Sequence, residues 1–315
     1  MQSDTQQLSG AGPDSIHWLL HLKERIERLS VGLAPPTQSF DHPPTDDERH
    51  HIQRQAFVEQ LRAASLLDAS EPLHTIEFGC GNGALSYAVW LASRGACSSV
   101  LIDRRQVLPQ TLVHAQAEVG LPAASHLGTG APAWQPLHTC ADVSQIDAEF
   151  LRTTVCGGRC VALANHLCGD ALDCAMRAAV EAWPGEGDSG HLEAFLAATC
   201  CHHKIQWEAF AGRELFATWG LSPQDFEQIR RWSRFAPRRS REASTQSRVT
   251  LEAERLCISA DEAAALGTSC RLLLDRARKS FLSNHGFATT LLHHVPFEAT
   301  GDNVLMVAVR PRMGA

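Results

Sequence analysis

The stretch I-E-F-G-C-G-N-G-A-L-S, residues 76–86, decides the fold of this chain. The residues before it read as a β-strand, and those after it read as a helix. Between the two, Gly79, Gly81 and Gly83 alternate with other residues. Glycine lets the backbone turn tightly and lets a ligand approach it beside the start of a helix. The spacing is not that of a G-x-G-x-x-G dinucleotide fingerprint, so the stretch predicts a turn built for another ligand.

The rest of the chain alternates between strands and helices in the same way. Strands are predicted over residues 74–80, 98–104, 138–143, 159–168 and 191–201, and helices over 83–95, 107–120 and 170–183. Strands separated by single helices indicate a parallel sheet covered on both faces. Two final strands, over 287–297 and 303–311, are close enough for an antiparallel hairpin. This order resembles the class I methyltransferase fold, a Rossmann-like α/β fold with a mostly parallel seven-stranded sheet.

The domain organisation follows from what interrupts this alternation. Residues 1–47 hold an amphipathic helix and a proline-rich linker, and part of this region is predicted to be disordered. Proline breaks helices and strand ladders, so the linker marks a boundary. Residues 48–315 form the predicted methyltransferase domain. Within it, residues 204–267 are predicted to be a helical insertion, followed by a closing helix over 268–286.

Composition excludes several classes of protein. The chain has 28 basic and 35 acidic side chains, a net charge of −7, so any nucleic-acid surface has to be local. No apolar run is long enough to span a bilayer, so no membrane association is expected. The chain has 11 cysteines and a polar N-terminal stretch without a secretory signal. We therefore expect reduced thiols and an intracellular location, in the cytoplasm or the nucleus.

Acidic residues around the turn suit a cationic nucleoside cofactor. Glu77 precedes the first glycine, where a carboxylate suits a cationic amino-acid head group. Asp103 ends the next predicted strand, where an acid can bind ribose hydroxyls. Asp142 ends the third strand, in a position suited to an adenine amino group. With the three glycines, these acids match the S-adenosylmethionine pocket of class I methyltransferases. The alternative is a glycine-rich turn without a ligand.

Two further strand ends carry polar motifs, N-H-L-C-G-D at 165–170 and C-C-H-H at 200–203. Ligands on open α/β sheets bind beyond the carboxyl ends of the strands. No metal is expected here, because adjacent ligands cannot easily share one tetrahedral zinc ion and the usual Cys-x2-4-Cys spacing is absent. Buried cysteines more often pack as small apolar groups. His202 and His203 are expected to shape a substrate pocket.

Together these motifs resemble the eukaryotic tRNA:m(4)X modification enzymes, tRNA 2'-O-methyltransferases that act on the fourth nucleotide of the acceptor stem. The likeness runs in order over residues 48–310, through R-H-H-I-Q-R-Q, E-F-G-C-G-N-G-A-L-S, H-L-C-G-D-A-L-D-C-A-M-R, C-C-H-H-K-I-Q-W and L-L-D-R-A-R-K-S-F-L-S-N-H-G-F. It implies S-adenosylmethionine as cofactor and tRNA as partner. The chain departs from the family in three respects. Residues 1–79 hold no cysteine for the family's N-terminal zinc modules, Asn165 replaces a lysine, and Ala277 replaces a glycine.

Methyl transfer from a sulfonium to a ribose hydroxyl needs alignment and a base near the hydroxyl. His166 is the titratable candidate for that base, and Asn165 can orient the hydroxyl as donor or acceptor. His202 or Arg278 is expected to close the far side of the acceptor site. The alternative for His166 is a structural histidine at the end of a strand.

The stretch R-R-W-S-R-F-A-P-R-R-S-R, residues 230–241, is densely basic within an acidic chain. Arginine pairs well with phosphate, and Trp232 can stack on a base or pack in the core. RNA contact is therefore predicted, and a solvated helix face is the alternative. The arginines concerned are Arg230, Arg231, Arg234, Arg238, Arg239 and Arg241.

The sequence therefore predicts an S-adenosylmethionine-dependent tRNA 2'-O-methyltransferase. Two alternatives stay open at this point. One is a methyltransferase for a protein or a small molecule. The other is a non-catalytic RNA-binding homologue, which the replacement of the family's lysine by Asn165 allows.

Overall fold

The chain builds one seven-stranded sheet. The computed structural model describes residues 13–30, 45–67, 72–106, 109–119, 133–155, 157–185, 190–237, 250–297 and 299–311. The strands are β1 (Leu73–Phe78), β2 (Cys97–Asp103), β3 (Leu137–Cys140), β4 (Arg159–Asn165), β5 (His191–Ala198), β6 (Ala288–His293) and β7 (Val304–Val309). They lie in the order β3-β2-β1-β4-β5-β7-β6. The first five pair in parallel, and β7 is antiparallel to β5 and β6, which confirms the predicted sheet and its closing hairpin.

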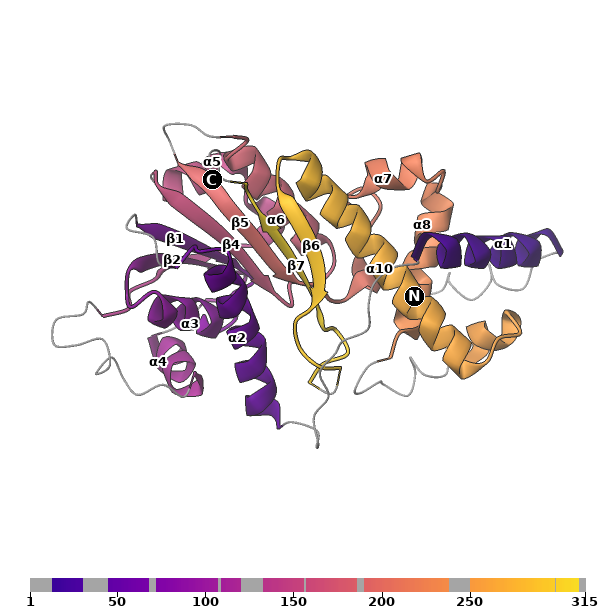
Figure 1. The fold of residues 1–315 in the computed structure, drawn as a ribbon, viewed down its shortest axis with the longest axis horizontal. Coiled ribbons are helices and arrows are strands. Elements are labelled where there is room, and N and C mark those ends of the chain that lie inside the picture. Colours follow the sequence, from indigo (N-terminus) through magenta and orange to yellow (C-terminus); the bar gives the residue numbers. More distant parts are fainter. Residues whose placement is uncertain are drawn as a thin grey trace.

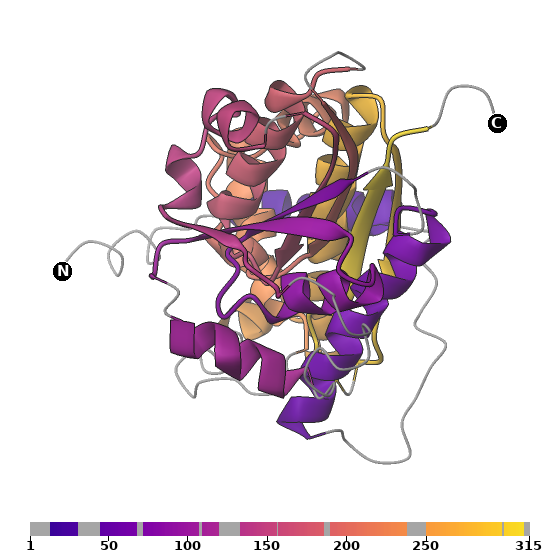
Figure 2. The same ribbon diagram turned by 90° about the vertical axis from the view of Figure 1, so that its left-hand side faces the viewer.

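Helices cover both faces of this sheet (Figures 1 and 2). Phe57 and Leu85 pack on one face with Leu163, and Met176 and Leu282 pack on the other. The central strand β4 is buried along its first six residues, as expected for a strand covered on both sides. On the first face lie α2 (Asp46–Ala63), α3 (Ala84–Ala92) and α4 (Pro109–Glu118), and on the second α5 (Ala148–Thr154), α6 (Asp170–Ala182) and α10 (Ala260–Asn284).

A helical layer extends beyond the sheet, around the far part of α10 (Figure 1). It contains α1 (Pro13–Ser30), α7 (Arg213–Thr218) and α8 (Pro223–Trp232). Leu22 of α1 is buried in the same apolar cluster as Phe226 and Leu273. Trp18 Nε1 donates a hydrogen bond to Asp225 Oδ1 at 3.0 Å. The N-terminal helix, which the sequence analysis separated from the main domain, therefore packs against the predicted insertion.

The closing helix starts earlier than the sequence analysis predicted. α10 begins at Ala260 rather than near residue 268. A capping box at Ser259 sets this start, because Ser259 Oγ accepts from the Glu262 backbone N–H and Glu262 Oε2 accepts from the Ser259 N–H at 2.7 Å. The predicted disordered start and most of the proline-rich linker fall on residues 1–12 and 31–44, which lie outside the described residues.

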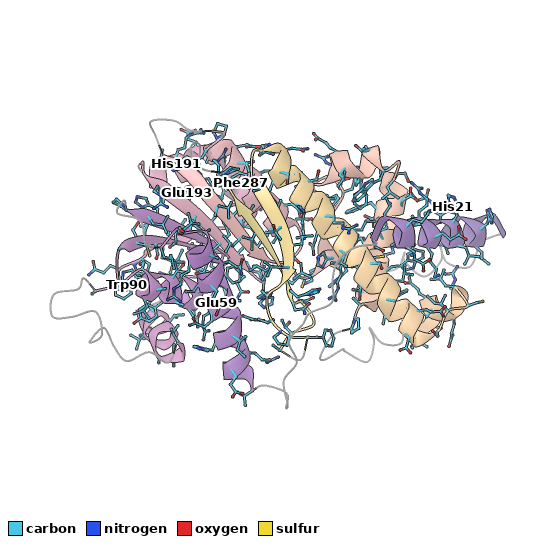
Figure 3. The ribbon with its side chains drawn as sticks, viewed as in Figure 1. His21, Glu59, Trp90, His191, Glu193 and Phe287 are labelled. Carbon is cyan, nitrogen blue, oxygen red and sulfur yellow. The ribbon has the colours of Figure 1, made fainter. Side chains whose placement is uncertain are left out.

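Charged residues join β4 and β5 at their amino ends. Arg159 Nε donates to Glu193 Oε1 at 2.6 Å, and His191 Nε2 lies 3.1 Å from the same oxygen. Figure 3 shows His191 and Glu193 at the start of β5. The polar sequence motifs lie at the other edge, where the parallel strands end. None of the helices in the described part of the chain is both long enough and apolar enough to cross a membrane.

Candidate active site at the carboxyl edge of the sheet

The glycine-rich turn connects β1 to α3, and its three glycines have φ angles of 67°, 57° and 79°. Side chains are strained in this region, so glycine is required. A Cβ on Gly79 would meet Leu167 Cδ1 at 2.7 Å, and one on Gly83 would meet Leu101 Cδ1 at 2.9 Å. A Cβ on Gly81 would meet nothing within 4 Å. Gly79 and Gly83 therefore permit close packing, whereas Gly81 borders open space.

Glu77 lies buried at the base of this turn. Its side chain is 3% exposed, and its Oε2 accepts a hydrogen bond from the Ser86 N–H at 3.0 Å. Ser86 is in the first turn of α3, where backbone N–H groups have no partner within the helix. Burial raises the pKa of Glu77 to about 7, although the Ser86 hydrogen bonds and the charge of Arg54 act in the opposite direction. A neighbouring cation would favour the ionised form of this carboxyl.

The structure brings Asp103 to the turn and places Asp142 one strand further away. Asp103 ends β2, and its Oδ2 accepts from the Gly81 N–H at 3.0 Å. Cys140 pairs with Asp103 across β2 and β3, so Asp142 follows just beyond that pair. Asp142 is exposed, and hydrogen bonds from the Ser144 hydroxyl and backbone lower its pKa. The turn and the two aspartates therefore follow three neighbouring strands.

The segment N-H-L-C-G, residues 165–169, lies against the glycine turn, since Leu167 is the side chain that a Cβ on Gly79 would meet. Asn165 is the last residue of β4, and its Oδ1 is buried without a hydrogen bond from any described residue. Gly169 lets the segment approach Lys204, the residue after the C-C-H-H motif, because a Cβ on Gly169 would meet Lys204 Cβ at 2.9 Å. One segment thus connects the glycine turn with the end of β5.

His166 sits in this segment with a left-handed backbone, φ 58°. Its Nε2 lies 3.3 Å from Gln53 Oε1 of α2. With the amide oxygen as acceptor, Nε2 carries the proton and Nδ1 is the unprotonated nitrogen. Burial lowers the pKa of His166, so the ring is neutral at neutral pH. Gln53 was not among the predicted site residues, and the sequence signal for it is its position in the R-H-H-I-Q-R-Q stretch.

Arg278 and His202 are buried in a network of charges. Arg278 is 0% exposed, and its Nη2 donates to Asp173 Oδ2 at 2.5 Å and to Gly169 O at 3.2 Å. His202 Nε2 lies 2.8 Å from Asp275 Oδ1. Burial alone would raise the pKa of Asp275, but His202 and Arg278 hold it below its usual value. Through these contacts both residues hold the surrounding loops in place. Their contact with substrate stays a prediction.

The basic stretch begins beside the C-C-H-H motif. Arg230 donates to the backbone oxygen of His203 and pairs with Glu227. Trp232 is 1% exposed and packs in the core, so the structure favours the packing alternative for this residue. Arg231 is exposed and Arg234 is half-buried, whereas Arg238, Arg239 and Arg241 lie outside the described residues.

The strand order with a reversed seventh strand, and a glycine turn after β1, define the class I methyltransferase fold. A sequence model of the family described as Methyltransferase TRM13 matches residues 52–309. The chain belongs to this family of methyltransferases.

Curated relatives carry the same family name. The tRNA:m(4)X modification enzyme TRM13 of Schizosaccharomyces pombe is 25% identical over 271 residues, which cover 79% of this chain and 67% of that protein. The tRNA:m(4)X modification enzyme TRM13 homolog of Mus musculus is 25% identical over 362 aligned positions, which cover 92% and 73%. A solved structure of a possible exported protein from Bordetella parapertussis aligns with a TM-score of 0.38 and 16% identity, covering 92% of this chain and 79% of that one.

Proposed function

We propose that this methyltransferase transfers a methyl group from S-adenosylmethionine to a ribose 2'-hydroxyl in the acceptor stem of tRNA. The observation that carries the proposal is the contact between the two halves of the site. Leu167, next to His166, packs on Gly79 of the turn. A candidate base and a candidate cofactor turn thus adjoin at one edge of the sheet, as methyl transfer requires. The names of the relatives support tRNA as the substrate, and such a substrate is met in the cytoplasm or the nucleus.

The described residues fit this cofactor. Open space above Gly81 admits a ligand against the backbone. Glu77, whose carboxyl is already close to ionising at neutral pH, would neutralise the amino group of the methionine part. Asp103 would accept from the ribose hydroxyls, and Asp142 from the adenine amino group. When bound, S-adenosylmethionine supplies an electrophilic methyl group on a sulfonium.

The acceptor side of the site rests on His166. A neutral imidazole with an unprotonated Nδ1 can take the proton of the ribose hydroxyl, and Gln53 holds the ring by its Nε2–H. Asn165 offers an oxygen without a partner among the described residues, which suits a hydroxyl donor. These two residues would replace the lysine that the resemblance leads one to expect at position 165.

The arginine stretch would hold the phosphates of the acceptor stem. Each phosphate contact releases counterions, so tRNA affinity should fall steeply with salt. Replacing Arg238, Arg239 and Arg241 together by alanine should reduce the log–log salt slope by about 1 for each lost contact. Filter-binding titrations at several salt concentrations measure this slope. An unchanged slope would mean that these arginines form only a solvated face.

Ribose-methylation mapping on tRNA, with purified protein and S-adenosylmethionine, tests the proposed function. We expect one new 2'-O-methyl group at a single acceptor-stem position. Incubation with protein extract and labelled cofactor separates a protein methyltransferase from this function. Cofactor binding without methylation of any substrate would instead support a non-catalytic RNA-binding homologue.

A further inference from the structure

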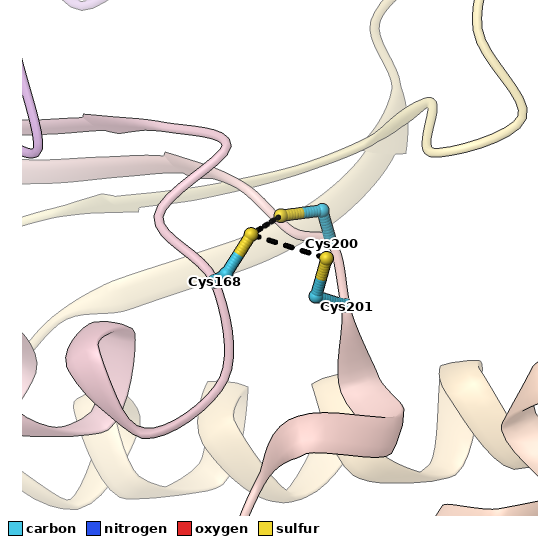
Figure 4. A group of neighbouring side chains, drawn as sticks. All are labelled: Cys168, Cys200 and Cys201. Atoms are coloured by element: carbon cyan, nitrogen blue, oxygen red, sulfur yellow. Dashed lines mark hydrogen bonds between the residues drawn. The ribbon is translucent and has the colours of Figure 1, made fainter. Parts of the chain in front are cut away.

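Three cysteine thiols meet where β4 and β5 end (Figure 4). Cys168 follows β4, whereas Cys200 and Cys201 follow β5. Cys168 Sγ lies 3.5 Å from Cys200 Sγ and 3.1 Å from Cys201 Sγ, and all three sulfurs lie within 4.8 Å of one another. Zinc–sulfur bonds of about 2.3 Å place two thiolates of a tetrahedral site roughly 3.8 Å apart. The sulfurs therefore have nearly the spacing of ligands to one ion.

The backbone explains how two adjacent cysteines can face the same point. Neighbouring side chains of an extended chain point in opposite directions, which is why C-C in the sequence does not predict a shared ion. Cys201, however, has φ 49° and ψ 36°, in the left-handed region. This turn brings its sulfur to the side of Cys168, as Figure 4 shows. A left-handed conformation costs about 1–2 kcal/mol for a residue other than glycine, so the surrounding fold must hold it.

Two of the three thiols have raised pKa values, so their thiolate forms need a positive charge close by. Contacts with the neighbouring cysteines and burial raise the pKa of Cys200 well above its usual value, so this group stays protonated without a positive partner. Although the contact with Cys200 and the charge of Lys204 act in the opposite direction, the contact with Cys201 and burial raise the pKa of Cys168 as well. Three thiolates and a divalent ion sum to one negative charge, which the Lys204 ammonium can balance. Cys168 is exposed, so an ion and the displaced protons can reach solvent.

We propose that Cys168, Cys200 and Cys201 bind one Zn²⁺ ion as thiolates and leave its fourth position open. Three protein ligands with one open position are the arrangement of zinc sites that take water or a substrate atom. Binding replaces three S–H bonds with three Zn–S bonds and releases three protons, so affinity rises with pH. The ion would lock the segment that carries His166 to the loop that carries His202, directly beside the proposed acceptor site.

A metal titration of the reduced full chain tests this site without cofactor or tRNA, so its result is independent of the proposed function. Cadmium is the probe, because its thiolate complexes absorb in the ultraviolet, and zinc competition then gives the zinc affinity. We expect one ion per chain. Cys168→Ser should weaken binding by roughly a hundredfold or more, since even second-shell changes cost 10–100-fold. Cys257→Ser is the matched control, because Cys257 is exposed like Cys168 but lies outside the cluster of three sulfurs.

Several outcomes would overturn the proposal. The first is a result on the parent chain alone. If it does not bind one cadmium or zinc ion, the site is excluded, whatever the variants do. Equal binding by Cys168→Ser and Cys257→Ser would place the ion elsewhere. Formation of a disulfide between Cys168 and Cys201 with no metal uptake, seen by mass spectrometry after mild oxidation, would assign the cluster to redox chemistry instead.

Discussion

The glycine turn and the segments that follow β4 and β5 are the two halves of the proposed site, and they are built in different ways. The first half is local, because Glu77 and Asp103 come from the neighbouring strands β1 and β2, and backbone N–H groups of Ser86 and Gly81 donate hydrogen bonds to them. The other half gathers His166 from the segment after β4, Gln53 from α2 and the loop that follows β5. Its side chains come from distant parts of the chain. The first half therefore depends on backbone shape, and the second on contacts between side chains.

The largest effect should come from closing the space above Gly81. Gly81→Val should abolish S-adenosylmethionine binding, because the new side chain occupies the open space beside the turn. Gly157→Val is the matched control, since Gly157 is also left-handed, with φ 77°, and also borders open space, but lies before β4. Isothermal titration calorimetry measures both. Equal cofactor affinity in a folded Gly81→Val protein would show that the ligand does not approach the turn.

A smaller effect is expected on the acceptor side. His166→Ala should keep cofactor binding but lower single-turnover methylation of saturating tRNA by roughly a hundredfold or more, the scale of lost general-base catalysis. His166→Gln can orient the hydroxyl but cannot accept its proton, so it separates the two roles. If His166→Ala reacts as fast as the parent, His166 is structural. The half of the site that contains it then supplies no base for methyl transfer.

Cofactor affinity should depend on pH through Glu77. Its pKa is about 7, and only the ionised carboxylate attracts the cationic amino group, so affinity should rise between pH 6 and 8 by roughly tenfold. Glu77→Gln should bind weakly and without this dependence. An equally steep rise in Glu77→Gln would assign the titration to another group.

The same raised pKa has a consequence for stability. The ordinary pKa of a glutamate is about 4.5, and that of folded Glu77 is about 7. Between these two pH values, folded Glu77 holds a proton that the unfolded chain has released. The free energy of unfolding of the ligand-free parent should therefore fall over this range relative to Glu77→Gln. Urea denaturation at pH 5 and pH 7.5 measures the difference. A constant difference between the two proteins would contradict the raised pKa.

The smallest effect should come from Gln53. Gln53→Leu removes the hydrogen bond to His166 Nε2. A hydrogen bond of this kind contributes about 1 kcal/mol, so the methylation rate should fall by roughly fivefold while cofactor affinity is unchanged. A structural role alone would lower the melting temperature without moving the pH profile of the rate. An upward or downward shift of that profile in Gln53→Leu would support a positioning role.

The sequence alone predicted the sheet, its closing hairpin and the turn, because these depend on local patterns. Alternating strands and helices, the glycines of residues 79–83 and the acid at the end of β2 are all visible in the printed chain. The start of α10 was predicted wrongly, although the sequence carries a signal for it. The capping box Ser259–Glu262 starts α10 inside the region that broken alternation had assigned to the insertion.

The sequence by itself determined the class of the fold and the glycine turn with its acidic neighbours, since periodicity and glycine placement act over a few residues. Only the tertiary structure decided the partners of the side chains in the candidate site. It set Gln53 against His166, buried Arg278 between Asp173 and Asp275, and brought Cys168 to Cys200 and Cys201. The physical reason is that parallel strands bring their carboxyl ends to one edge of the sheet, where Cys168 meets Cys200 and Cys201. The helices α2 and α10, packed on the sheet, bring Gln53 and Arg278 to the same edge.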